Sequence, residues 1–569
     1  MKLSDIIHTS RRAYIWSGIL LWLLPLTLIV PNAALGITEF LYTPWDRLAN
    51  FFLPLGVYML LAGCWKRTGL LSLLSLPLMI LCAFQIVLLY LYGESIIAID
   101  MFLNVVTTNF TEATSLLNNL IPSIVCVCLL YLPPLVLGIV LTRKKWYATR
   151  GQRRPMLIAG AVAAAAGIVF FGMAYGIDRD YRPERKLFPV NVICNMFEAA
   201  ERTEQTCRYA ETSASFRFDA RPTRQDSAEV YVLVIGETSR ADNWQLAGYD
   251  RPTNPRLSRR SGITFFDKVL SESNTTHKSV PLLMSHISSE EFGDSLTRVK
   301  GIIDAFKEAG FRTAWISNQQ HNGSYIDFFG EQADSVHFLV DDGRLHLDTD
   351  VVPVLRQFLN DNSGQPAFIA IHTYGSHFVY RDRYPREEAF FGPEHQSQAE
   401  AGNRDQLINA YDNTIRYTDL VLDSIIGAVE ATGRPAGLLY LSDHGEDIFD
   451  DSRDRFLHAS PNPTYWQIHI PLLVWTSDEF RSRYPELQRR LEEHRHLNIS
   501  SGHSVFHTLA DMAGLTMPML DRSSSLASES FREPVRRYLN DYNESVPLGE
   551  SGLRTVDIEK FNSMNISVE

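Results

Sequence analysis

Cysteine is scarce in this chain, and the later part of the sequence has none. Six cysteines are spread over 569 residues, and none follows Cys207. Four of the six lie in or beside long apolar runs: Cys64, Cys82, Cys126 and Cys128. The other two, Cys194 and Cys207, lie outside these runs and are candidates for a disulfide bond in an oxidising compartment. A disulfide framework is therefore excluded for the residues after 207.

Positive charge is also in short supply. The 53 Lys and Arg residues are outnumbered by 65 Asp and Glu residues, which gives a formal net charge of −12 at pH 7. Nucleic-acid binding normally requires a basic surface, so no nucleic-acid partner is expected. An anionic lipid substrate is not excluded, because a bound metal ion can dominate the local field. Internal repeats and low-complexity tracts are absent as well.

Long apolar runs, by contrast, fill the first third of the sequence. At 569 residues the chain is too long for one hydrophobic core, and at least two domains are expected. We expect an α-helical transmembrane domain of five helices at residues 1–176, because the runs there are long enough, or nearly so, to cross a hydrocarbon core of about 30 Å. The five runs are residues 14–30, 50–65, 70–92, 120–141 and 156–176. The first is not a cleavable signal peptide, since further spans follow it.

The distribution of basic residues predicts the orientation of these helices. Basic residues gather before the first run, after the second, and between the fourth and fifth, whereas the loops at 31–49 and 93–119 share a single arginine. The N-terminus is therefore predicted to be cytoplasmic. Five spans then place the chain after about residue 177 outside, which in a Gram-negative cell is the periplasm.

The rest of the chain predicts a bridge and a second domain. Residues 177–228 are charged and contain three scattered prolines, which predicts a bridge that is partly helical around residues 190–202 and lies near the membrane surface. At residues 229–569, alternating strands and helices predict an α/β fold with a mainly parallel sheet. Strands are expected at residues 231–235, 311–317, 367–372, 437–442 and 470–476, and helices at 297–309 and 404–430.

Metal-ligand residues follow two of these strands directly. Glu237 stands after the first strand, and Asp443 and His444 stand after the strand at 437–442. In an open α/β sheet, ligands bind at the carboxyl ends of the strands. Carboxylate and imidazole together suit zinc or manganese. The structural alternative for the first motif is a helix N-cap region, in which Glu237 and Thr238 serve the backbone.

A hydroxyl-rich segment at residues 271–284 supplies candidate nucleophiles. By composition it is equally a capped helix start, and composition does not choose among its hydroxyls. The candidates are Ser273, Thr275, Thr276 and Ser279. Lys278 in this segment and Asn318 farther on are candidates for contacts with phosphate, although Lys278 fits a solvated surface charge equally well.

Two histidines are candidates for the same site. His377 follows the strand at 367–372, and His458 follows Asp443 and His444 by about one loop length. The ordinary alternative for each is a core histidine or a helix cap. We expect the remaining histidines near strands and helices to be structural: His372, His469, His503 and His507.

The loop at 93–119 mixes apolar and polar residues. Asn104, Thr108 and Glu112 recur at every fourth position, which places them on one face of a helix. A polar stripe beside a membrane would bind a lipid head group, with Glu112 facing an ammonium. An interfacial amphipathic helix with a solvated face is the simpler alternative.

Four motifs in combination resemble the phosphoethanolamine transferases. They are GETSRADN at 236–243, NTTHKSVP at 274–281, GSH at 375–377 and SDHGE at 442–446. Members of this family are inner-membrane enzymes with a catalytic domain like that of alkaline phosphatase or sulfatase. The resemblance covers nearly the whole chain and implies this fold for residues 229–569, in the periplasm.

The resemblance also implies a cofactor and roles for individual residues. It implies zinc, held by Glu237, Thr276, Asp443 and His444. The family nucleophile lies four residues before the valine of Val-Pro, which selects Thr276 and leaves Thr275 as the fallback; a metal ion would lower the pKa of its hydroxyl. His377 and His458 match positions that contact the transferred phosphate or a second metal. Asn104, Thr108 and Glu112 match residues that contact the lipid donor.

The implied reaction transfers phosphoethanolamine from phosphatidylethanolamine to lipopolysaccharide, in the core or in lipid A, through a covalent intermediate on threonine. Both substrates are membrane lipids, and a monomer is expected. The lack of cysteines after residue 207 and the sequences at 315–320 and 473–477 resemble the members of the family that modify the lipopolysaccharide core more than those that modify lipid A. The alternatives are a membrane-anchored glycerol-phosphate transferase, a sulfatase-like hydrolase, or a sensor built on a decayed hydrolase domain.

Overall fold

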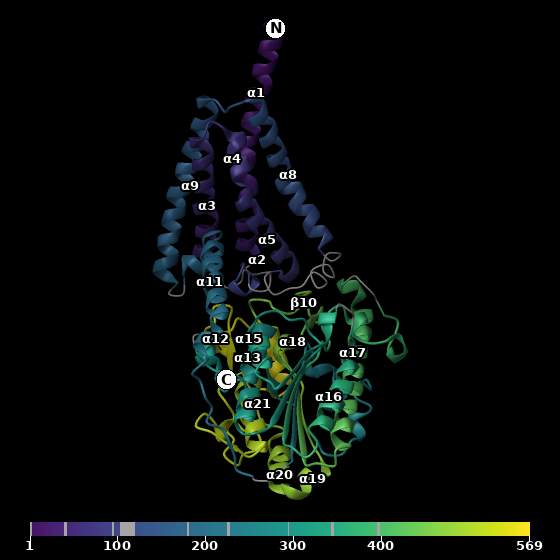
Figure 1. Ribbon diagram of the computed structural model, residues 1–569. Helices are drawn as coiled ribbons and strands as arrows, with labels where there is room; N and C mark the ends of the chain where they lie inside the picture. The colour runs from purple at the N-terminus through teal and green to yellow at the C-terminus, as the bar shows by residue number, and fades with distance from the viewer. Residues whose placement is uncertain are drawn as a thin grey trace. The chain divides into compact units, whose positions relative to one another are not determined.

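The computed structural model describes residues 3–38, 42–93, 96–102, 120–178, 181–224, 228–293, 295–342, 346–394 and 399–568 (Figure 1). These residues fall into two compact units, one ending at Glu201 and the other beginning at Arg202. The predicted substrate residues Asn104, Thr108 and Glu112 lie outside the described residues.

The first unit is helical. Its helices are α1 (Leu3–Leu28), α2 (Val30–Thr38), α3 (Pro44–Cys64), α4 (Thr68–Leu74), α5 (Leu76–Tyr92), α8 (Ile121–Lys144), α9 (Arg150–Ile177), α10 (Pro183–Lys186) and the start of α11 (Val190–Cys207). Within the described residues, four stretches are long and apolar enough to cross a membrane, or five if α4 and α5, bent by 55°, form one span. This agrees with the five predicted helices, and the third predicted run is the one that bends.

Small residues bring α3 and α9 together. A Cβ added at Gly56 would lie 2.4 Å from the backbone nitrogen of Ala164, and one added at Gly167 would lie 2.5 Å from the Cα of Leu53. Backbones this close are typical of membrane helices, where packing rather than hydrophobic burial drives association. The two helices therefore form a tight pair.

Helix α11 corrects one expectation about cysteine. Cys194 and Cys207 lie on this one helix, and both are free. Thirteen residues at 1.5 Å each separate their Cα atoms by about 20 Å, whereas a disulfide requires less than about 7 Å. The proposed pairing is therefore wrong within this chain.

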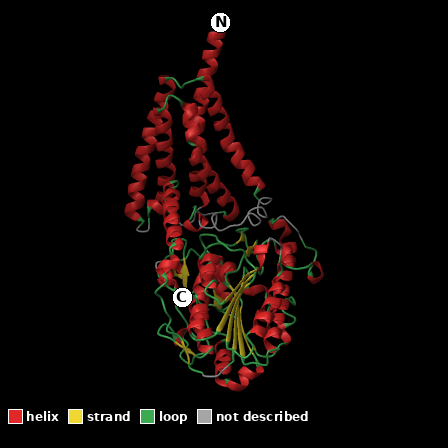
Figure 2. Cartoon of the chain, in the orientation of Figure 1, coloured by secondary structure: helices red, strands yellow, loops and turns green. Residues whose placement is uncertain are grey.

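The second unit is built on a sheet of seven described strands (Figure 2). In spatial order they are β3 (Ile263–Phe266), β11 (Leu472–Thr476), β8 (Ala436–Ser442), β2 (Val230–Gly236), β7 (Ala367–His372), β5 (Arg312–Ser317) and β6 (Ser335–Phe338). The five strands from β8 to β6 are parallel, and β11 is antiparallel to both of its neighbours. The predicted, mainly parallel sheet is confirmed.

Helices cover both faces of this sheet (Figure 1). One face carries α13 (Thr276–Met284), α14 (Ile302–Glu308) and α21 (Ser501–Met512), whose apolar side chains pack against Tyr231, Leu233 and Ile235 of β2. The other face carries α16 (Val351–Asp361) and α17 (Arg404–Glu430). Strand β2 is fully buried because both of its faces are covered.

Smaller elements complete the unit. The remaining helices are α12 (Tyr209–Thr212), α15 (Tyr325–Gly330), α18 (Tyr465–Ile468), α19 (Asp478–Arg483), α20 (Pro485–His494) and α22 (Thr555–Ser563). The short strand pairs are β1 (Arg221–Pro222) with β13 (Leu515–Thr516), β4 (Val269–Leu270) with β12 (Ile499–Ser500), β9 (Asp447–Ile448) with β10 (Phe456–Leu457), and β14 (Arg537–Leu539) with β15 (Ser545–Pro547).

Candidate metal centre and active site

Two neighbouring strand ends set the position of the candidate ligands. Strands β2 and β8 run parallel, with Gly236 opposite Ser442, so Glu237 and Asp443 leave the sheet side by side. The backbone nitrogen of Thr238 donates to Asp443 Oδ1 at 3.1 Å. Thr238 has a φ of 60°, which is unfavourable for a β-branched residue and is typical of functional turns. The next helical turn, Ala241–Asn243, has Arg240 as its N-cap and no side-chain cap hydrogen bond, so the N-cap alternative for Glu237 and Thr238 is wrong.

Glu237, Asp443 and His444 form a buried cluster whose ligand atoms all lie within 4.8 Å of one another. His444 Nε2 lies 3.3 Å from Glu237 Oε1 and 3.3 Å from Asp443 Oδ2. His444 Nδ1 donates to the carbonyl of Gly445 at 2.9 Å, which directs Nε2 toward the two carboxylates. The cluster is the donor set that the strand-end motifs predict.

The electrostatics of the cluster call for a cation. Asp443 Oδ2 is buried and has no hydrogen-bond partner among the described residues. Burial raises the pKa of Asp443 to about 7, and the charge of Glu237 adds to the rise. Burial lowers the pKa of His444, but the charges of Asp443 and Glu237 outweigh it and raise that pKa to about 9. Two buried carboxylates thus favour positive charge at this point, and oxygen and imidazole donors fit zinc.

Thr276 completes the cluster at the first turn of α13. Its Oγ1 donates to Glu237 Oε1 at 3.0 Å and lies 3.1 Å from His444 Nε2. Thr276 is the first residue of α13, and the positive end of the helix dipole there favours a negatively charged group beside it. By contrast, Thr275 Oγ1 lies 3.1 Å from Ser273 Oγ, and Ser279 Oγ donates to the carbonyl of Thr275. The four hydroxyls that composition could not separate are thus separated by their partners.

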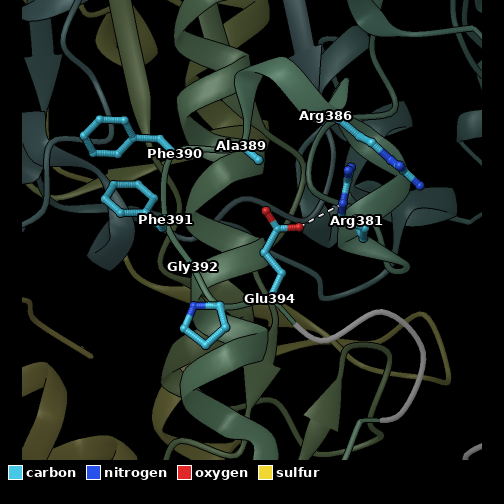
Figure 3. Close-up of a pocket in the computed structure, with 8 residues that line it drawn as sticks. Arg381, Arg386, Ala389, Phe390, Phe391, Gly392 and Glu394 are labelled. Carbon is cyan, nitrogen blue, oxygen red and sulfur yellow. Dashed lines mark ion pairs between the residues drawn. The ribbon is translucent and has the colours of Figure 1, made fainter.

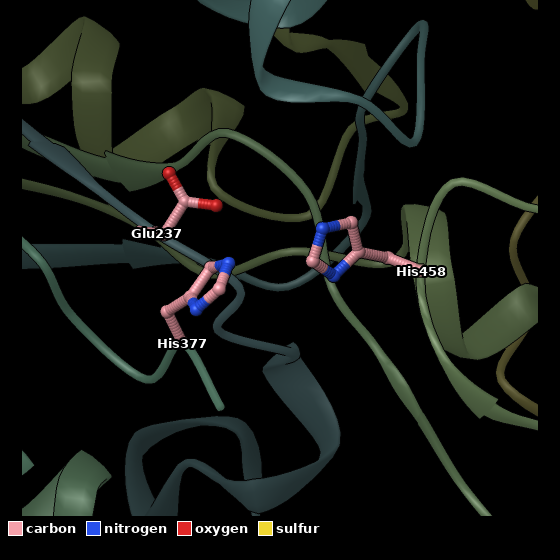
Figure 4. A group of neighbouring side chains, drawn as sticks. All are labelled: Glu237, His377 and His458. Atoms are coloured by element: carbon pink, nitrogen blue, oxygen red, sulfur yellow. The ribbon is translucent and has the colours of Figure 1, made fainter. Parts of the chain in front are cut away.

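A second group of ligand-type residues shares Glu237. The ligand atoms of Glu237, His377 and His458 lie within 4.8 Å of one another, and their side chains face a common space (Figure 4). The ring centroids of His377 and His458 are 5.7 Å apart, and that of His458 is 4.2 Å from that of His444. The structure therefore brings both predicted histidines to the cluster.

Two other predicted residues bind the surrounding scaffold. Lys278 is only 1% exposed, and its Nζ donates to the carbonyl of Asn540, so the surface-charge alternative is wrong. The amide of Asn318 is buried and donates to Asp348 Oδ1 at 2.8 Å. Of the histidines expected to be structural, His372 is buried in the sheet, and burial lowers its pKa to about 4. His469, His503 and His507 are hydrogen-bonded to Asp242, Ser524 and the backbone of Asp521, respectively.

Two residues of the site, Gln319 and Gly375, were not predicted from the sequence. Gln319 Nε2 donates to Glu237 Oε2 at 3.0 Å and to the carbonyl of Thr373 at 2.9 Å. Gly375 has a φ of 56°, and a Cβ there would lie 2.6 Å from the carbonyl oxygen of Glu237. No pattern in a single sequence marks Gln319, whereas the GSH motif does contain Gly375.

A hollow of about 510 Å³ lies in the segment after His377 (Figure 3). Arg381, Arg386 and Phe390 are among its lining residues, and Arg381 Nε lies 2.8 Å from Glu394 Oε2. Its lining includes none of the clustered ligands, so it is distinct from the candidate metal centre.

Comparisons with known proteins agree with this geometry. Residues 229–515 match the Sulfatase family. Phosphoethanolamine transferase EptA of Escherichia coli K12 is 30% identical over 294 residues, which cover 50% of this chain and 53% of that protein. The chain thus spans about half the length of the curated relatives it matches.

Two solved structures add to this comparison. The C-terminal periplasmic domain of EptC from E. coli, in complex with zinc, is 26% identical with a TM-score of 0.53, and covers 58% of this chain and 97% of that one. The integral membrane phosphoethanolamine transferase EptA from Neisseria meningitidis is 21% identical with a TM-score of 0.68. This second match covers 91% of the chain and 99% of that structure, and it shows that the fold is shared across both units.

Proposed function

We propose that this chain, which belongs to the sulfatase family, is a zinc-dependent phosphoethanolamine transferase of the bacterial inner membrane, acting as a monomer with its second unit in the periplasm. The observation that carries the proposal is the position of the Thr276 hydroxyl, within hydrogen-bond distance of both Glu237 and His444. The curated relatives named above, and the apolar helices of the first unit, support it.

The proposed donor is phosphatidylethanolamine. The Thr276 oxygen forms a bond to its phosphorus, and the bond from phosphorus to the diacylglycerol oxygen breaks. Glu237 holds the Thr276 hydroxyl in place through its hydrogen bond. Zinc, bound by Glu237, Thr276, Asp443 and His444, would lower the pKa of that hydroxyl and offset the charge of the phosphate.

The proposed acceptor is lipopolysaccharide, in its core or in lipid A. An oxygen of the acceptor forms a bond to phosphorus, and the Thr276 oxygen leaves. His377 or His458 gives a proton to the diacylglycerol oxygen as it leaves in the first step and takes one from the acceptor in the second, because both lie beside Glu237. We assign Asn104, Thr108 and Glu112 to the donor's head group, with Glu112 facing its ammonium.

Transfer of a labelled head group tests this proposal. The purified full chain in detergent is incubated with phosphatidylethanolamine labelled in its ethanolamine and with lipopolysaccharide. We expect release of diacylglycerol and label in lipopolysaccharide, and mild acid cleavage assigns the label to core or lipid A. Thr276→Ala should lose at least about 10³-fold in rate, while Thr275→Ala, the matched control, should retain activity. Release of free phosphoethanolamine without transfer would indicate a hydrolase and overturn the proposal.

A further inference from the structure

Glu446, the last residue of the SDHGE motif, contacts His458. Its Oε2 lies 3.0 Å from His458 Nδ1, and its Oε1 accepts a hydrogen bond from the Tyr380 hydroxyl. Glu446 is fully buried and Tyr380 is 1% exposed. A buried carboxylate with a partner on each oxygen has a fixed orientation.

The short β9–β10 hairpin brings Glu446 and His458 together. Its antiparallel register places Leu457 opposite Asp447, so the next pair outward is His458 and Glu446. The residues that flank His458, Leu457 and Ala459, have φ values of 72° and 61°. Residues other than glycine rarely adopt such φ values. Such values persist where the surrounding structure imposes them.

Tyr380 connects this pair to the segment that carries His377. It lies three residues after His377, and its ring packs against those of Phe378 and Tyr411, with centroids 5.3 Å and 5.1 Å away. Arg240 holds the backbone of Glu446, because its Nη1 donates to the Glu446 carbonyl at 3.4 Å and pairs with Asp450 at 2.7 Å. The Glu446 carboxylate is thus fixed between two segments of the site.

We propose that Tyr380 and Glu446 are positioning residues, which fix the tautomer and the ring orientation of His458 so that its Nε2 faces the transferred phosphate. The inference rests on the proposed function and deepens it by naming the residues that position His458. The contact with Glu446 fixes which ring nitrogen of His458 carries a proton, in the way that a carboxylate orients a histidine in other sites. Held in this way, His458 is placed to give a proton to the departing diacylglycerol oxygen and then to take one from the attacking acceptor.

The test compares two buried tyrosines of one segment. Tyr380→Phe removes the hydroxyl that holds Glu446, while Tyr384→Phe removes one that pairs with Asn413. We expect kcat of the full chain to fall about tenfold in Tyr380→Phe, with KM for phosphatidylethanolamine, zinc content and melting temperature unchanged. Tyr384→Phe should keep the wild-type kcat.

Variants of Glu446 provide a second measurement. Glu446→Ala should lower kcat by about 10²-fold, and Glu446→Gln should recover part of the loss, because an amide oxygen still accepts from His458 Nδ1. Equal kcat in Tyr380→Phe and Tyr384→Phe, or losses that follow zinc content, would overturn the inference. Absence of any phosphoethanolamine adduct on the wild-type enzyme would instead overturn the proposed function itself.

Discussion

At the scale of single residues, the site depends on partners that lie far away in the sequence. Glu237, Asp443 and His444 were predictable because each follows a buried strand. Gln319, whose amide orients Glu237, was not, because only the fold brings residue 319 to the end of β2. Local sequence therefore indicates candidate ligands, whereas the residues that orient them depend on tertiary packing.

The partly buried contact between Asp242 and His469 predicts a dependence of stability on pH. Burial raises the pKa of Asp242, but the hydrogen bond and charge of His469, with the charge of Lys560, lower it to about 2. His469 Nδ1 lies 2.8 Å from Asp242 Oδ2. Because the folded-state pKa lies below the ordinary value of 3.8, Asp242 stabilises the fold above about pH 4, and this contribution is lost as the pH falls toward 2.

Unfolding of the detergent-solubilised chain measures this contribution. Wild type should exceed Asp242→Asn in free energy of unfolding by about 2 kcal/mol between pH 5 and 7. The difference should shrink steadily as the pH falls from 5 to 3. A difference that does not change over that range would show that the Asp242 charge is not responsible.

At the scale of elements, the existence of strands and helices was predictable, and local chemistry shifted some of their ends. The strand at 367–372 and the helix at 404–430 match β7 and α17 at both ends. The helix expected at 297–309 begins only at Ile302, because Val299 is extended, with a ψ of 165°, and separates the short turn at Leu296–Arg298 from the helix. The strand expected from residue 470 begins at Leu472, because Pro471 cannot donate to a ladder.

The loop after β7 yields a prediction at this scale. A Cβ at Gly375 would lie 2.6 Å and 2.7 Å from the Glu237 carbonyl oxygen and nitrogen, and φ is 56°. Gly433 has a φ of 63°, but a Cβ there would meet nothing within 4 Å. Both alanine substitutions carry a backbone strain of about 1–2 kcal/mol, so Gly433→Ala is the matched control for Gly375→Ala.

Zinc content distinguishes the two variants. We expect Gly375→Ala to bind zinc at least about tenfold more weakly, because it displaces the backbone of a proposed ligand. Gly433→Ala should bind zinc as wild type does while losing a similar amount of stability to strain. Equal zinc affinity in both variants would mean that the contact with Glu237 does not position the ligand.

At the scale of the whole molecule, composition separated the membrane unit from the second unit. Apolar runs and loop charges were sufficient for this. Long apolar runs mark the segments that cross a membrane, and basic residues mark the loops on its cytoplasmic side. The disulfide expected between Cys194 and Cys207 failed because composition does not reveal that one continuous helix holds both residues.

Reporter fusions test the predicted orientation of the membrane unit. Fusions after residues 67 and 148 should report the cytoplasm, because basic residues flank those positions. Fusions after residues 45 and 230 should report the periplasm. A cytoplasmic result at 230 would place the proposed active site on the wrong side of the membrane for lipopolysaccharide.

Mapping of the covalent intermediate tests whether Thr276 is the nucleophile. The full chain is incubated with phosphatidylethanolamine in the absence of an acceptor, digested, and examined by peptide mass spectrometry. We predict a phosphoethanolamine adduct on Thr276, because its hydroxyl alone among the four candidates contacts both Glu237 and His444. An adduct on Thr275, or diacylglycerol release by Thr276→Ala at the wild-type rate, would contradict the account.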